Sequence, residues 1–113
     1  MIEKVLLEYL EDNLDVPVVY EAPAQITSYV LIDKTGSSRR NTIVTSTFAI
    51  QSYGASLLEA AELSKTVEGV MDSFWHEDGI TRVELDTDYN FTNTATKQYR
   101  WQAVYRITHY QEV

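Results

Sequence analysis

Few side chains in this sequence are spaced in a way that suggests chemistry. His76, Glu77 and Asp78 follow one another at the end of an expected helix and could be imagined as metal ligands. Neighbouring side chains at a helix end point in different directions, and a histidine in the last turn already interacts favourably with the helix dipole. His109 falls on the apolar face of an expected strand, where we expect a histidine at the rim of the core. We therefore expect no metal site and no cofactor.

Asp86 and Asp88 resemble the spaced acidic pair with which some sugar-transferring enzymes hold a divalent cation. So short a pattern arises often by chance in an acidic chain, and we expect these two residues to lie in a turn. The chain has no cysteine and no glycine-flanked serine elbow, and neither histidine has a suggestive neighbour for nucleophilic catalysis. We therefore expect no catalytic residues and predict that the protein is not an enzyme.

The polar segment 34–41, KTGSSRRN, is expected to form the loop of a hairpin. It has one glycine and lacks the lysine-serine ending of a phosphate-binding loop, so we expect no nucleotide there. Arg39 and Arg40 place two cations at the hairpin tip of an otherwise acidic protein, and a self-associating subunit could set this tip against an acidic patch on its neighbour. The alternative is a solvated loop whose charges only keep the protein soluble.

The chain has the composition of a single folded domain that spans residues 1–113. Apolar residues make up 44% of it, and only four glycines and two prolines interrupt the pattern. Seventeen acidic against nine basic residues give a net charge of -8, which repels phosphates and argues against specific binding of DNA or RNA. No apolar stretch approaches the roughly 20 residues that span a bilayer, and the chain does not begin with a signal-like run. We expect a soluble protein, made in the cytoplasm and without membrane contact.

Hydrophobic periodicity predicts two helices and five strands. The helices are expected at 2–12 and 56–75, and the strands at 16–21, 29–33, 42–53, 80–86 and 97–110. Pro17 cannot donate a ladder hydrogen bond, so we expect either that the first strand lies at a sheet edge or that Pro17 stands at the start of the strand. Because hairpins connect strands locally and only one helix lies between strands, the pattern predicts an α+β fold. We expect a mainly antiparallel sheet of four to five strands with two helices packed on one face, in the order α-β-β-β-α-β-β.

The second helix is expected to supply much of the core. Ser56 and Glu59 form a capping-box signature at its start. Its apolar stripe consists of Ala60, Leu63, Val67, Val70, Met71 and Phe74. This stripe should pack on the face of the last strand that carries Trp101, Ala103 and Tyr105, because alternate residues of a strand share one face.

Aromatic residues are unusually frequent, with eight tyrosines and two tryptophans in the chain. Such side chains are enriched at protein interfaces because they bury a large area at a low entropy cost. Core packing is the first explanation for Tyr99, Trp101 and Tyr105. The excess over the needs of one small core favours an interface in addition.

Four segments together resemble the small tail-terminator, or tail-completion, proteins of long-tailed phages and prophages. The segments are VPVVYEAP (16–23), YVLIDKTGSSRRN (29–41), FAIQSYGASLLEAAEL (48–63) and DYNFTNTATKQYRWQAVY (88–105). Their order and spacing carry the resemblance: an early edge strand with a proline, a TG loop, an IQSY strand that runs into a helix, and a late YRWQAVY strand. The resemblance covers nearly the whole chain.

The resemblance implies a structural virion protein that forms a ring, typically a hexamer, on top of the finished tail tube. Such a ring ends tube growth and joins the tail to the head connector. Its partners would be further copies of the chain, the major tail tube protein and head-tail connector proteins, while DNA would pass through the lumen without specific binding. The protein would lie at the head-proximal end of the virion tail, and in the bacterial host cytoplasm during assembly.

Three other functions stay open from the sequence alone. A neck or head-tail adaptor protein has the same size and setting as a terminator. A small-molecule binding module could enclose an apolar pocket between a curved sheet and two helices, and an enzyme could use the same scaffold. A co-purifying ligand would favour the binding module, measurable turnover the enzyme, and a discrete ring in electron microscopy the tail protein.

Overall fold

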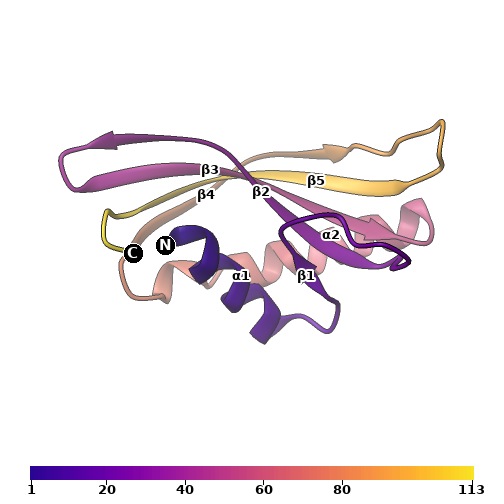
Figure 1. Ribbon diagram of the computed structural model, residues 1–113, viewed down its shortest axis with the longest axis horizontal. Helices are drawn as coiled ribbons and strands as arrows, with labels where there is room; N and C mark the ends of the chain where they lie inside the picture. Colours follow the sequence, from indigo (N-terminus) through magenta and orange to yellow (C-terminus); the bar gives the residue numbers. More distant parts are fainter.

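A five-stranded mixed sheet and two α-helices make up this α+β protein (Figure 1). The computed structural model describes residues 1–113. In chain order the elements are α1 (Ile2–Asn13), β1 (Val18–Val19), β2 (Tyr29–Arg40), β3 (Ile43–Gly54), α2 (Leu57–Met71), the 3-10 helix η1 (Phe74–His76), β4 (Ile80–Asn90) and β5 (Tyr99–Tyr110). The strands lie side by side in the order β1-β2-β3-β5-β4. All pairings are antiparallel except that of β1 with β2, so the expectation of a mainly antiparallel sheet is confirmed.

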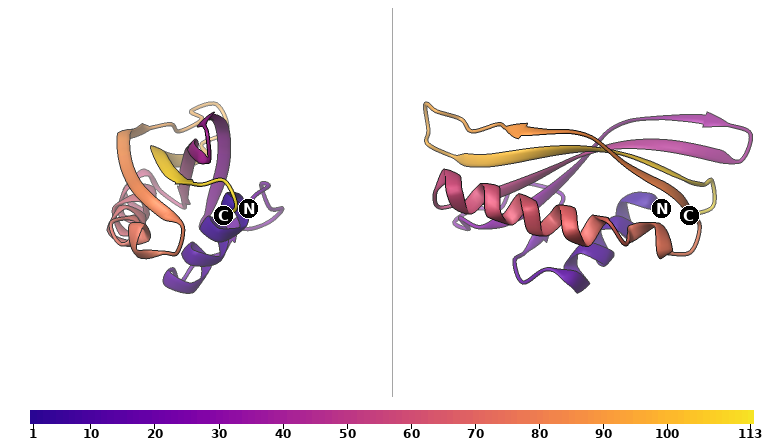
Figure 2. Two further views of the ribbon diagram at one scale, coloured as in Figure 1. Left: turned by 90° about the vertical axis from the view of Figure 1, so that its left-hand side faces the viewer. Right: turned by 180° about the vertical axis from the view of Figure 1, so that it is seen from behind.

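The helices and the sheet form two layers of an elongated molecule that measures 44 × 25 × 23 Å. Figures 1 and 2 show α1 and α2 on the same side of the strongly twisted sheet, while no helix covers the other face. The helix α2 contacts β3 and β5, and α1 contacts β1 and α2. Neither α-helix has the length and hydrophobicity that crossing a bilayer requires.

The β2–β3 hairpin is longer than the sequence predicted. Residues 34–40 continue β2 and pair with β3 as far as Arg40, with one bulge around Thr35. The turn is reduced to residues 41–42, and Asn41 adopts the left-handed region with φ 57°. The expectation of a loop was wrong. The polar composition of residues 34–40 indicates only that they are exposed to solvent, whereas their pairing with the threonine-rich first half of β3 makes them a strand.

The helix α2 begins as predicted and ends earlier. The Ser56 hydroxyl accepts a hydrogen bond from the Glu59 backbone at 3.1 Å, and the Glu59 carboxylate accepts one from the Ala55 backbone at 3.1 Å. The capping signature is therefore confirmed. The helix ends at Met71 and not at Trp75, because the chain tightens there into i→i+3 hydrogen bonds and continues as η1.

The core lies between α2 and the inner face of the sheet. The register places Phe48 of β3 opposite Tyr105 of β5, and Ile50 opposite Ala103, with all four side chains buried. The other residues of the main hydrophobic cluster are Ile2, Leu6, Leu10, Val18, Val30, Ile32, Val67, Met71, Phe74, Ile80 and Ile107. These side chains fill the space between the sheet and the helices.

The predicted stripe of α2 faces this core with two differences. Leu63 and Val70 are half-buried at its sides, and the polar Ser64 lies in the fully buried row. On the sheet, Trp101 is half-buried as well. The 3.6-residue period predicts the row correctly, but it does not predict a small serine inside it.

The two peripheral elements α1 and β1 close one side of the core. The buried stripe of α1 consists of Ile2, Leu6 and Leu10. The Tyr9 hydroxyl donates a hydrogen bond of 2.6 Å to the Val70 carbonyl oxygen, and the Tyr9 ring lies 4.9 Å from the ring of Phe74. The strand β1 is only two residues long and lies at the sheet edge, as Pro17 predicted, with the Pro17 carbonyl oxygen accepting from the Val30 backbone at 2.9 Å.

The strand β4 forms the opposite edge of the sheet. It extends to Asn90, four residues beyond the predicted end at Asp86. Bulges interrupt its pairing with β5 between Ile80 and Arg82 and between Leu85 and Thr87. Its outer edge pairs with no other strand of the chain.

Candidate functional site

Arg39 and Arg40 lie at the end of β2, beside the turn that closes the β2–β3 hairpin. Both side chains are exposed, and because neighbouring residues of a strand point to opposite faces, one guanidinium leaves each face of the hairpin. Neither guanidinium forms an ion pair within the chain, whereas Arg106 pairs with Asp86 at 2.9 Å. In Figure 1 this tip extends beyond the helices at one end of the long axis.

A groove with a volume of about 400 Å³ runs between α2 and the edge strand β4, and we call it the α2–β4 groove. Trp75 is 54% exposed and Leu85 is 42% exposed, so apolar surface faces solvent there. The carboxylates of Glu68 and Asp72 lie beside these apolar walls. The remaining lining residues are Lys65, Gly69, Met71, Val83 and Tyr105.

The carboxylates of the groove are crowded. Burial raises the pKa of Glu68, and the neighbouring Asp88 and Asp72 raise it further, while Lys65 lowers it. Neither Glu68 nor Asp72 forms an ion pair within the chain. A cation placed among these carboxylates would therefore relieve their mutual repulsion.

Tyr105 forms the floor of the groove. Its side chain is 3% exposed, and its hydroxyl takes part in none of the hydrogen bonds within the chain. Burial raises the pKa of Tyr105 well above its usual value, and Glu68, Asp72 and Asp88 raise it further, so the phenol stays protonated. Because this hydroxyl has no partner within the chain and lies in the lining of the groove, it is free to bind a group that enters the groove.

The uncovered face of the sheet carries a row of hydrogen-bonded amides and phenols. The Gln51 amide donates to Gln102 Oε1 at 2.8 Å, and the Tyr53 hydroxyl donates to Gln51 Oε1 at 2.7 Å. The Gln102 amide in turn donates to the Tyr89 hydroxyl, and Arg100 Nη1 donates to the Tyr53 hydroxyl at 3.2 Å. This row joins β3, β5 and β4 and satisfies its own polar groups.

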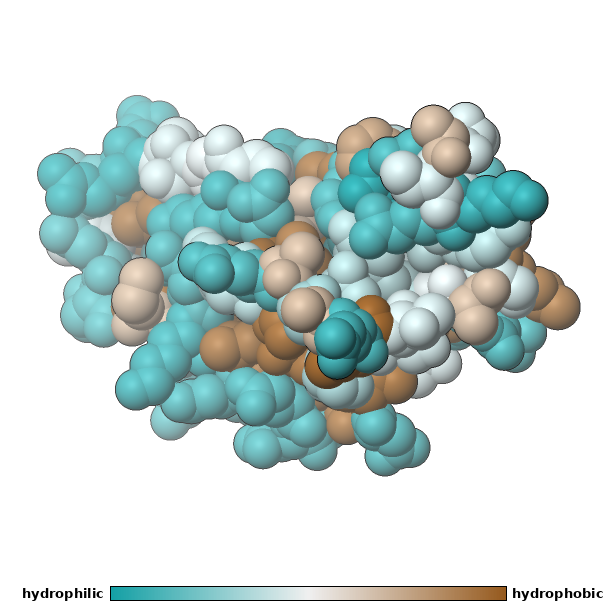
Figure 3. Space-filling view, turned by 45° about the vertical axis from the view of Figure 1, so that its right-hand side comes forward, coloured by the Kyte–Doolittle hydropathy of each residue, from teal (hydrophilic) through white to brown (hydrophobic).

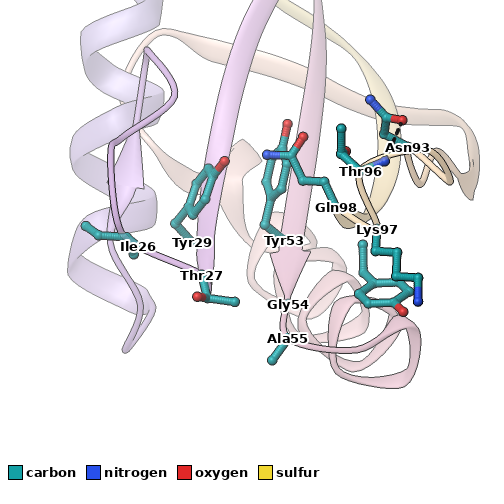
Figure 4. Close-up of a pocket in the computed structure, with 11 residues that line it drawn as sticks. Ile26, Thr27, Tyr29, Tyr53, Gly54, Ala55, Asn93, Thr96, Lys97 and Gln98 are labelled. Atoms are coloured by element: carbon teal, nitrogen blue, oxygen red, sulfur yellow. Dashed lines mark hydrogen bonds between the residues drawn. The ribbon is translucent and has the colours of Figure 1, made fainter.

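A second hollow of about 480 Å³ lies where β3 ends, next to the loop between β4 and β5 (Figure 4). Tyr29 and Tyr53 stand side by side in it, with ring centroids 4.3 Å apart. Burial raises the pKa of Tyr29, and Tyr53 raises it further. Lys97 is the one charged residue of the lining, so the hollow has no acid paired with a base. The other lining residues are Ile26, Thr27, Gly54, Ala55, Asn93, Thr96, Gln98 and Tyr99.

His109 is buried in the core and not at its rim, which corrects the expectation from the sequence. Its Nδ1–H donates to the Tyr110 carbonyl oxygen at 2.9 Å, and its Nε2 accepts from the Ser46 hydroxyl at 2.8 Å. The expectation that no histidine has a suggestive neighbour was therefore wrong as well. Ser46 is 0% exposed and lines none of the surface hollows described above, so this serine-histidine pair offers a substrate no access. Both ring nitrogens of His109 are therefore hydrogen-bonded within the core.

His76 is exposed at the end of η1. Its Nδ1 lies 3.2 Å from the Ser73 carbonyl oxygen, and its ring centroid lies 3.7 Å from that of Trp75. Glu77 and Asp78 follow it without converging on it, since no group of three or more His, Cys, Asp or Glu side chains is arranged to hold a metal ion.

Asp86 and Asp88 lie on β4, so the expectation of a turn was wrong. Asp86 binds Arg106 Nε at 2.9 Å, and the Asp88 carboxylate accepts a hydrogen bond from Trp101 Nε1 at 3.3 Å. Two aspartates two residues apart fit an exposed edge strand because each has a donor on the neighbouring strand β5.

Exposed apolar side chains are spread over several elements. On the face shown in Figure 3, apolar residues gather in the lower middle and hydrophilic residues surround them. The large exposed hydrophobic residues are Met1, Tyr20, Ile26, Leu57, Leu58, Trp75, Leu85, Tyr89, Phe91 and Tyr110. Five of these ten are aromatic, which agrees with the expectation that the aromatic excess exceeds the needs of the core.

The sequence predicted the cationic tip but missed the groove. One signal was available, since Glu68 and Asp72 stand four residues apart on an expected helix and must share a face. The contribution of Asp88 depends on the β4–β5 register, and the free hydroxyl of Tyr105 depends on packing, so neither could be inferred from spacing alone.

Comparison with known proteins adds no family to these observations. A scan of protein-family models and a search of curated proteins both gave no significant match to the chain.

Proposed function

We propose that this protein is a structural subunit of a long-tailed phage or prophage tail. In this proposal it forms a ring, as a hexamer, that caps the tail tube, ends tube growth and joins the tail to the head connector. It acts by binding proteins and not by catalysis, and it needs no cofactor. Its partners are further copies of itself, the major tail tube protein and head-tail connector proteins, at the head-proximal end of the virion tail.

The observation that carries the proposal is the extended tip of the β2–β3 hairpin. Arg39 and Arg40 are exposed there on opposite faces, and no carboxylate of the same chain neutralises them. Two unpaired cations on a protruding hairpin are better suited to a partner than to the stability of the monomer. This favours association over a purely solubilising role.

The layering supports the same function. A subunit in the order α-β-β-β-α-β-β, with both helices on one face, keeps its other sheet face and its hairpin ends available for contacts. A closed ring requires two different surfaces on each subunit that meet by rotation, and a hairpin tip at one end of an elongated molecule provides one of them. The net charge of -8 suits a ring through which DNA passes without binding.

The four sequence segments resemble tail-terminator proteins, which supports a tail ring as the assembly. The first experiment should therefore test whether the protein forms a ring. The purified protein should sediment as a discrete oligomer and appear as a ring in negative-stain electron microscopy. Added to growing tail tubes that lack a terminator, it should stop elongation. A protein that stays monomeric at all concentrations and leaves tube length unchanged would contradict the proposal.

A further inference from the structure

We infer that the α2–β4 groove is the receptor for the β2–β3 hairpin tip of a second copy of this chain, with a guanidinium of Arg39 or Arg40 seated among Glu68, Asp72 and the Tyr105 hydroxyl. This inference rests on the proposed ring and adds the pair of surfaces through which neighbouring subunits meet.

The groove has the chemistry of a guanidinium site. Glu68 and Asp72 present carboxylates that form no ion pair, and Tyr105, whose residue is only 3% exposed, presents a hydroxyl with no partner within the chain. A planar guanidinium can donate to two carboxylates and a phenol at once, which a compact ammonium group matches less well. The exposed ring of Trp75 adds a face on which a guanidinium can stack.

The apolar lining of the groove favours a protein ligand over a bare metal ion. Trp75 and Leu85 belong to the ten large hydrophobic residues that are exposed, and both line the groove. A metal ion would bury neither of them, whereas the stem of an arginine and the strand that carries it would cover both. The occupant therefore has a cationic end and an apolar or polypeptide body.

The hairpin tip fits this description and is supplied by the same chain. Because Arg39 and Arg40 leave opposite faces of the strand, a guanidinium can reach the carboxylates whichever face of the hairpin meets the groove. The turn at residues 41–42 is short, and Arg39 and Arg40 are the charged side chains of a tip whose other exposed residues, Ser38, Asn41 and Thr42, are small and polar. No carboxylate of its own chain competes for them.

The two surfaces also meet the requirement for closure. The tip belongs to β2 and β3, and the groove is lined by α2, η1, β4 and Tyr105 of β5. A contact that each pair of subunits makes once is heterologous, and it leaves one subunit with a free groove and the other with a free tip. Contacts of this kind repeat from copy to copy and form a ring when the rotation closes.

Charge reversal tests the pairing. Arg39→Glu together with Arg40→Glu, and separately Glu68→Lys together with Asp72→Lys, should each weaken self-association by roughly tenfold or more in sedimentation, because like charges would then face each other. Combining all four substitutions should restore most of the association. Lys97→Glu and Glu62→Lys are matched controls, since both residues are exposed, form no ion pair and lie on the other hairpin loop and on α2. Melting curves of every variant show that the monomer still folds.

A crosslink tests the contact directly. The chain has no cysteine, so Arg40→Cys in one preparation and Glu68→Cys in another each introduce a single thiol. When the two proteins are mixed and oxidised, a disulfide dimer that contains both variants is expected to dominate over either symmetric dimer. Arg40→Cys mixed with Glu62→Cys should give much less of it.

The outcomes separate this inference from the proposed function. A parent protein that never associates overturns both. Two results would overturn the pairing of tip and groove and leave the ring in place, provided that the parent forms rings. In the first, the variant with both tip arginines reversed associates like the parent. In the second, the four substitutions together fail to restore association. Association that depends on an added divalent cation, or groove reversal that only abolishes binding to a different tail protein, would assign the groove to that ligand and equally refute the inference.

Discussion

The substitution Phe74→Ala probes the junction of the two helices and the sheet. Phe74 is 0% exposed in η1, belongs to the main core cluster and lies against the ring of Tyr9 at a centroid distance of 4.9 Å. Truncating a fully buried phenylalanine costs about 3–5 kcal/mol, and loss of the aromatic contact belongs within that range. A domain of this kind has a free energy of unfolding of about 5–15 kcal/mol, so the variant should retain only a small part of this free energy or should unfold.

Urea unfolding followed by circular dichroism measures this loss. The neighbouring substitution Trp75→Ala is a matched control, because Trp75 is the next residue of the same 3-10 helix and is 54% exposed. Its free energy of unfolding should change by about 0.5 kcal/mol or less. The core assignment would be wrong if both variants unfolded at the same urea concentration as the parent, or if Trp75→Ala were the more damaging of the two.

Three further predictions concern other parts of the fold. The raised pKa of Glu68 means that the folded chain binds this proton more readily than the unfolded chain, so the folded state loses stability as pH rises from the usual carboxyl range through this pKa. Glu68→Gln should therefore raise the melting temperature of the monomer at neutral pH and leave it unchanged well below that range. An equal gain in melting temperature at every pH would refute this explanation. Gly54→Ala should destabilise by about 1–3 kcal/mol in urea unfolding, since a Cβ there would come within 2.6 Å of a backbone nitrogen in the first turn of α2, whereas Gly36→Ala, with open space around it, should cost much less. Ser46→Ala should cost about 1–3 kcal/mol because it leaves His109 Nε2 buried without a donor, and the parent should not react with a fluorophosphonate probe; labelling of Ser46 would show that this pair is accessible and reactive.

The elements with a clear period were predictable from the sequence. The capped start of α2, the buried row through Val67 and Phe74, and the inward face of β5 all follow from spacing, because one face of each element must be buried. The edge position of β1 is one of the two placements that Pro17 allowed, and Pro17 itself directly precedes the strand.

The errors concern polar residues whose structure is set by partners far along the chain. Residues 34–40 and the pair Asp86 and Asp88 have the composition of loops, yet pairing with β3 and β5 makes them strand. His109 lies in the core because Ser46, more than sixty residues away, completes its hydrogen bonds. A single sequence does not contain these pairings, and the α2–β4 groove was missed for the same reason.

The bulges and edge strands of the sheet have a consequence for how copies of the protein can stick together. A flat, regular strand edge would recruit any other strand through its backbone and grow without limit, as in a fibril. Here β1 covers β2 beside the core, a bulge around Thr35 interrupts the exposed part of β2, and two bulges break the β4 edge. Backbone pairing between molecules is thereby discouraged on both edges. Side chains are left to decide which surfaces meet, and a contact selected by side chains has one geometry and can end in an assembly of finite size.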